Sequence, residues 1–217
     1  MPVEETSISS ELRKLGFQPG RILETILCTR NSDASINVAP MGVRLSGEDS
    51  MIIRPYNTTN TCINLSSRRD ACINITSDPE LFLYSAFKSE EDWLTRIVTS
   101  DDMTLLGSEA TAYVKISEED HTETERPSFS GRVTFVKVLT NYPSAFSRGR
   151  SLAIEAVIIS THIQFFIRNG QLEASNKLIQ CLMKMDEKIR KVSPPESPEV
   201  NVSSKLNRLV LQWRNSI

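Results

Sequence analysis

Residues 21–45 read RILETILCTRNSDASINVAPMGVRL, and this stretch decides the fold. Apolar residues alternate with Thr and Glu, a polar cluster interrupts them at residues 31–33, and the alternation then resumes. Two strands that flank a short polar turn are typical of a β-hairpin. Residues 51–65 (MIIRPYNTTNTCINL) and 71–76 (ACINIT) follow closely and add shorter apolar runs. The whole region therefore predicts a β-rich domain.

Further strands and short helices surround this hairpin. Strands are predicted over residues 21–30, 35–45, 51–54, 71–75, 108–116 and 131–139. Thr58 or Thr59 is placed to cap a short helix that runs to Leu65, because a threonine hydroxyl accepts a hydrogen bond from an otherwise unpaired amide. A proline near the first turn predicts another short helix, from Pro79 to about Phe87. Residues 118–128 (EEDHTETERPS) are charged and predict a solvated loop between the last two strands.

The C-terminal part of the chain has a different pattern. Apolar residues recur at helical spacing over residues 152–166, although their β-branched content leaves a strand as an alternative. Residues 172–192 and 202–213 predict two more amphipathic helices. The fold class is therefore α+β and mainly β: a six-stranded antiparallel barrel in a domain of residues 1–146, and a small three-helix unit in residues 147–217.

Composition and charge exclude several classes of function. The net charge of −2 provides no basic surface for nucleic acid. Four scattered cysteines and two histidines have no metal-ligand spacing, so no metal site is predicted, and the cysteines are interpreted as reduced. The N-terminus lacks the apolar core of a signal peptide, and residues 152–167 fall short of the ~20 residues that a membrane span needs. We therefore expect a soluble, cytoplasmic protein without a membrane segment.

Residues 54–61 offer groups that suit an anionic ligand. The sequence contains no obvious nucleophile or general base in this region, but Arg54 is followed by Thr58, Thr59 and Thr61 at the start of a predicted helix. A guanidinium group, hydroxyls and helix N-terminal amides together suit a phosphate. The alternative is that Arg54 forms a surface ion pair and that the threonines cap a turn.

The second strand of the hairpin carries Ala-Pro-Met-Gly at residues 39–42. Pro40 lacks an amide and can interrupt the ladder, whereas Gly42 permits close approach to the backbone. Met41 can pack against the face of a planar ring. These features suit a flat ligand with a polar edge, and a β-bulge is an equally compatible interpretation.

The order of these motifs resembles a known family. Residues 29–42 read T-R-N-x-D-x-x-x-N-x-A-P-M-G, residues 53–64 read I-R-P-Y-x-x-T-x-T-x-x-N, and residues 74–82 read N-I-T-x-D-P-x-L-F. This series resembles an uncharacterised, mainly archaeal family of FMN-binding split-barrel proteins. The wider group includes flavin reductase-like and pyridoxamine-phosphate oxidase-like proteins. The resemblance covers roughly residues 8–150.

The resemblance implies that FMN is bound at the interface of a homodimer. The residues that it places along the ring and the ribityl chain are Thr29, Asn37, Ala39, Pro40, Met41 and Gly42. The residues that it places near the phosphate are Arg54, Tyr56, Thr59, Thr61 and Asn64. It implies no particular catalytic residue.

Three functions remain open at this stage. The first is an FMN-dependent oxidoreductase of the flavin reductase type; because the dinucleotide motif G-x-G-x-x-G is absent, NAD(P)H or a redox partner would bind only transiently. The second is a non-catalytic flavin carrier or sensor whose helical tail contacts a partner. The third is a β-barrel interaction module without a cofactor.

Overall fold

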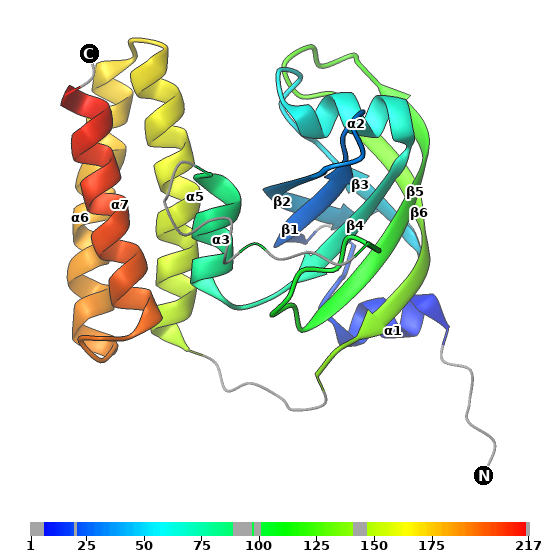
Figure 1. Ribbon diagram of the computed structural model, residues 1–217, viewed down its shortest axis with the longest axis horizontal. Helices are drawn as coiled ribbons and strands as arrows, with labels where there is room; N and C mark the ends of the chain where they lie inside the picture. Colours follow the sequence, from blue (N-terminus) through cyan, green and yellow to red (C-terminus); the bar gives the residue numbers. More distant parts are fainter. Residues whose placement is uncertain (1–6, 20, 89–96, 98–100, 141–146, 216–217) are drawn as a thin grey trace. The chain divides into compact units, whose positions relative to one another are not determined.

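A computed structural model describes residues 7–19, 21–88, 97, 101–140 and 147–215. The chain forms two compact units (Figure 1). The barrel unit comprises Met1–Thr76 and Ile97–Asn141, and the helical unit comprises Ser77–Arg96 and Tyr142–Ile217. The helical unit therefore takes in a segment, Ser77–Arg96, that lies within the predicted barrel domain of residues 1–146.

Six antiparallel strands close into a barrel within the described part of the chain, which confirms the predicted fold class. The strands are β1 (Ile22–Arg30), β2 (Ile36–Leu45), β3 (Ser50–Ile53), β4 (Asp70–Ile75), β5 (Ala110–Asp120) and β6 (Ser128–Val138). Their order around the barrel is β1-β2-β3-β6-β5-β4, so β1 pairs with both β2 and β4. The ladder between β2 and β3 covers only residues 43–45 of β2, so residues 36–42 pair with β1 alone.

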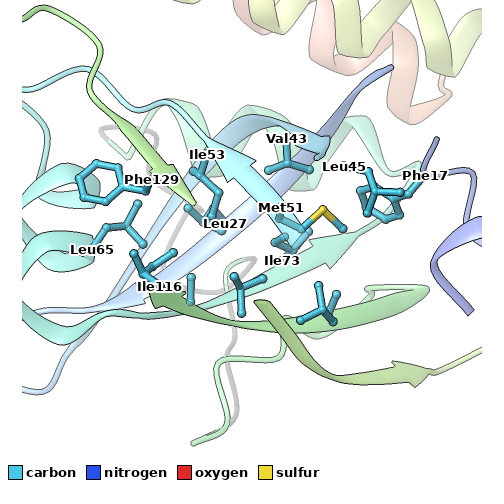
Figure 2. Packing of buried hydrophobic residues seen from close by; sticks show 14 of the residues in the cluster. Phe17, Leu27, Val43, Leu45, Met51, Ile53, Leu65, Ile73, Ile116 and Phe129 are labelled. Atoms are coloured by element: carbon cyan, nitrogen blue, oxygen red, sulfur yellow. The ribbon is translucent and has the colours of Figure 1, made fainter. Parts of the chain in front are cut away.

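Alternate residues of these strands fill the barrel. Leu27, Val43, Met51, Ile73 and Phe129 lie in one buried apolar cluster, which Figure 2 shows. Because successive side chains of a strand point to opposite faces, this cluster fixes which residues of each strand face inward. The remaining residues of each strand face the outer surface of the barrel.

The turn between β1 and β2 contains Ala34 in a left-handed conformation, with φ of +69°. A residue with a Cβ atom pays roughly 1–2 kcal/mol for this conformation. The Asp33 carboxylate offsets part of that cost, because it accepts a hydrogen bond from the Ser35 amide at 3.0 Å. The amide of Asn31 also bonds to the carbonyl of Ser35 at 2.9 Å, which closes the hairpin.

Two short helices accompany the barrel. Helix α1 (Ile8–Lys14) precedes β1, and α2 (Asn60–Arg68) connects β3 to β4. Thr59 is the N-cap of α2, which confirms one of the two predicted caps. Strands β5 and β6 are longer than predicted, because Asp120 pairs with Ser128, so the connecting loop is only residues 121–127.

The helical unit contains α3 (Pro79–Ala86), α5 (Arg148–Arg168), α6 (Leu172–Val192) and α7 (Pro198–Asn215). The stretch over residues 152–166 is helical, so the strand alternative is wrong. Helix α3 packs against α5 and α7, and the adjacent Phe87 ring lies 5.3 Å from the ring of Trp213. These contacts explain why α3 belongs with the C-terminal helices.

Helix α5 is longer than the apolar run seen in the sequence. Judged by length and composition alone, this 21-residue helix is long and apolar enough to cross a membrane. A helix inside a packed helical unit passes the same test, and α5 packs against α3, α6 and α7. The absence of a membrane segment therefore stays a prediction.

Candidate functional site

The predicted ring-binding residues lie on both faces of β2. Val43 belongs to the barrel core and Met41 packs against that core, so Ala39 also faces inward. Pro40 and Gly42 face the outer surface. A ligand on the outer surface of β2 could therefore contact the Pro40 ring and the bare Cα atom of Gly42. Ala39 and Met41 could offer it only their main-chain groups.

Four other predicted residues form a buried hydrogen-bond cluster, which we call the amide–hydroxyl cluster: Thr29, Asn37, Thr61 and Asn64. The Asn37 amide nitrogen donates to the hydroxyls of Thr29 at 3.2 Å and Thr61 at 3.0 Å. The Asn64 amide nitrogen donates to Thr29 at 3.0 Å and to the side-chain oxygen of Asn31 at 2.8 Å. All four members of the cluster are buried. The cluster thus ties α2 to the β1–β2 hairpin, and a contact between these side chains and FMN stays a prediction.

We expect Asn64→Ala to lower the free energy of unfolding by about 2 kcal/mol, because it removes a buried hydrogen bond to Thr29 and a partly buried one to Asn31. Urea denaturation of the protein without added ligand measures this change. Asn60→Ala is the matched control, since Asn60 lies on the same helix and is exposed. Equal stability of the two variants would contradict a structural role for the cluster.

Thr59 uses its hydroxyl within its own turn. The hydroxyl donates to the carbonyl of Tyr56 at 2.7 Å and accepts from the amide of Cys62 at 3.3 Å. The turn that leads into α2 is thereby fixed. The first amides of a helix have no partner inside the helix, so main-chain donors remain at this end of α2.

The β5–β6 loop clamps the segment that leads from β3 into α2. The amide of Asn57 donates to the carbonyl of Glu125 at 2.9 Å, and its side-chain nitrogen donates to the carbonyl of Thr124 at 2.6 Å. Arg54 and Arg126 each donate to the other's carbonyl, at 3.3 and 2.9 Å. The charged loop is therefore anchored to the barrel, while its residues 121–126 are exposed, as predicted from the sequence.

A cavity of about 340 Å³ lies where this loop meets the outer surface of β2 and β3. Its lining residues are Arg44, Arg54, Asp120, Thr122, Glu123, Arg126 and Ser128. Arg44 follows Gly42 by two positions, so both lie on the outer surface of β2. Arg44 therefore lines the cavity and shares the outer face of β2 with Pro40 and Gly42, which do not line it.

The cations around the cavity are incompletely paired. Arg54 forms an ion pair with Glu123, but its Nε atom is buried and has no hydrogen-bond partner among the described residues. Arg44 has no hydrogen bond or ion pair in the described part of the chain. The guanidinium of Arg126 lies 4.7 Å from the centre of the Tyr56 ring. The cavity thus has donors to spare for an added anion.

The two acidic residues of the cavity are held differently. The Asp120 carboxylate accepts a hydrogen bond from the Thr122 amide at 2.8 Å, and the Thr122 hydroxyl also donates to it. These bonds lower the pKa of Asp120, so it is ionised at neutral pH and fixed in its turn. Among the described residues, the Glu123 side chain contacts Arg54 alone, and it is 62% exposed.

These donors fit a phosphate monoester, which needs several hydrogen-bond donors and positive charge. Of the predicted phosphate residues, the structure brings Arg54 to the cavity and Tyr56 beside Arg126. Sequence reasoning missed Arg44 and Arg126. The alternation of Pro40, Gly42 and Arg44 along β2 was a usable signal for Arg44.

The three cysteines of the barrel unit are not placed to act as nucleophiles, whereas Cys181, in α6, is exposed. Cys28, Cys62 and Cys72 are buried, and burial raises the pKa of the Cys72 thiol to about 12, which keeps it protonated. Asn74, between the two thiols of Cys28 and Cys72, donates to the Met103 carbonyl at 3.2 Å. The described residues contain no cluster of three or more His, Cys, Asp or Glu side chains suited to a metal ion.

Three solved structures are similar to this chain, and the first of them supports the fold. An FMN-bound DUF447 protein from Methanosarcina mazei aligns over 91% of this chain and 98% of its own, with 18% identity and a TM-score of 0.72. An FMN-binding protein from Thermus thermophilus covers 54% of this chain and 71% of its own (15% identity, TM-score 0.44). The styrene monooxygenase flavin reductase of Pseudomonas putida S12 covers 53% and 80% (8% identity, TM-score 0.46).

The family assignment rests on the sequence of the barrel unit. Residues 23–140, more than half of the chain, match the family described as protein of unknown function (DUF447) N-terminal domain. The matched range begins in β1 and ends just after β6, so it spans all the strands described above. The chain therefore belongs to the DUF447 family.

Proposed function

We propose that this protein binds FMN, with the phosphate in the cavity beside Arg44, Arg54 and Arg126. The observation that carries the proposal is the buried Arg54 Nε atom without a partner, next to a second guanidinium that is also unpaired among the described residues. An FMN-bound relative in the same family supports the choice of ligand. The phosphate would then complete the hydrogen bonds that the cavity lacks.

The ring of FMN would lie along the outer surface of β2, against Pro40 and Gly42. Main-chain groups at Ala39 and Met41 would meet its polar edge. Thr61 would contribute its helix N-terminal amide rather than its hydroxyl, because that hydroxyl already accepts from Asn37. Thr59 would act only through its cap, because its own amide donates to the Tyr56 carbonyl at 3.1 Å. In this proposal the amide–hydroxyl cluster holds the strand and the helix in position.

The protein would act as a homodimer with FMN at the interface. Large apolar side chains are exposed on the outer surface of the barrel, including those of Ile22 (58% exposed) and Phe135 (55% exposed). Burial of such side chains against a second copy would be favourable. Light scattering at micromolar concentration should give twice the mass of the chain, and a monomer mass would contradict the dimer.

For the reaction, we propose an oxidoreductase of the flavin reductase type in the cytoplasm. Bound FMN supplies hydride and electron transfer, while the protein binds and orients it and needs no strong side-chain base. NADH or NADPH would bind only transiently. The second candidate is a flavin carrier or sensor whose helical unit contacts a partner, which the exposed Met183 and Leu211 favour.

Steady-state oxidation of NADH or NADPH with added FMN separates the two candidates. Turnover that depends on both the protein and FMN is expected of a reductase. Tight FMN binding without turnover on any donor would instead favour the carrier or sensor.

A further inference from the structure

We infer that Glu123 is a displaceable internal counter-ion of the phosphate site, which weakens FMN binding and keeps the cofactor exchangeable. The inference rests on the proposed function, since it concerns the same cavity. Glu123 pairs with Arg54, the residue whose Nε atom has no partner among the described residues. A phosphate that enters the cavity must compete with this carboxylate for the same guanidinium.

The ion pair between Glu123 and Arg54 is weak enough for an incoming anion to replace it. The Glu123 side chain is 62% exposed, and an ion pair with that much solvent contributes little stability. The backbone of the loop is held independently, through Asn57 to Thr124 and Glu125. The Glu123 side chain can therefore leave Arg54 while the loop stays in place.

Asp120, the other acidic residue that lines the cavity, is held in place, unlike Glu123. Two hydrogen bonds from Thr122 fix its carboxylate inside the turn, so it is not available to move. Glu123 has no such restraint. Only Glu123 can therefore exchange with an incoming anion.

When the FMN phosphate displaces Glu123 from Arg54, the Glu123 carboxylate stays close to the doubly charged phosphate. The repulsion between them lowers the affinity for FMN, and it acts far less on riboflavin, which lacks the phosphate. A site that carries its own competing anion releases its ligand readily. This property suits a flavin that exchanges with a partner rather than one held permanently.

The test compares Glu123→Gln with Glu125→Gln in the full-length protein. Both changes remove one negative charge from the same loop, but Glu125 does not line the cavity. Fluorescence titration should show FMN binding about tenfold tighter for Glu123→Gln and within about twofold of wild type for Glu125→Gln. Riboflavin affinity should change by less than about twofold in both variants. The difference should shrink at high salt.

Unchanged or weaker FMN binding by Glu123→Gln, with normal binding by the wild type, would overturn this inference alone. An equal gain for riboflavin, or the same gain in Glu125→Gln, would also overturn it, because the effect would not be competition at the phosphate. Failure of all three proteins to bind FMN would overturn the proposed function together with the inference.

Discussion

Arg54→Ala is expected to weaken FMN binding by about one to two orders of magnitude while the barrel stays folded. A charge-assisted hydrogen bond contributes roughly 1.5–3 kcal/mol, and each 1.4 kcal/mol is a tenfold change in affinity. Arg54 lies beyond the end of β3 and is absent from the apolar core, so the unfolding midpoint should change little. Fluorescence titration with FMN and with riboflavin measures the effect.

Arg132→Ala is the matched control for this substitution. Arg132 also lies on the outer surface of the barrel and pairs with Asp49 at 2.6 Å, but it does not line the cavity. Its replacement should leave FMN affinity unchanged. If Arg54→Ala binds FMN as well as the wild type does, and the wild type binds riboflavin equally well, the phosphate lies elsewhere.

Gly42→Val should give a folded, dimeric protein that no longer binds FMN. A Cβ atom at Gly42 would lie 3.0 Å from Cγ2 of Ile22 and 3.3 Å from Oε1 of Glu24. Both are exposed side chains that can move, and valine is favoured in strands. The added side chain would occupy the surface on which the ring is proposed to lie. Visible spectroscopy and light scattering together measure the outcome.

Gly131→Val provides the contrasting case. A Cβ atom there would lie 2.7 Å from the backbone carbonyl oxygen of Lys115, which cannot move without disturbing β5. This variant should be destabilised, whereas Gly42→Val should keep a near-normal unfolding midpoint. A yellow Gly42→Val protein with normal FMN affinity would require another place for the ring.

The sequence predicted the strands and the C-terminal helices because their periodicity is local. Helix α6 begins and ends at the residues predicted for it, Leu172 and Val192. The place of α3 was harder to predict, because its partners α5 and α7 lie more than 60 residues away along the chain. A short helix between two strands gives no local sign of that packing.

The candidate site was partly visible in the sequence. The motif around Arg54 and the cap at Thr59 are local features, and both were identified. The clamp between Asn57 and the β5–β6 loop joins residues 67 positions apart, which no local pattern reveals. Charged loop sequences usually indicate exposure to solvent, so Glu123 and Arg126 were not recognised as cavity residues.

The most direct test of the account is titration of the purified protein with FMN, followed by visible absorption. We expect saturable binding, seen as a change in the flavin bands at about 375 and about 450 nm when the protein is added to FMN. Binding should be tighter for FMN than for riboflavin, because the phosphate is the group that Arg44 and Arg54 would hold. Flavin bands that are the same with and without the protein would contradict the account.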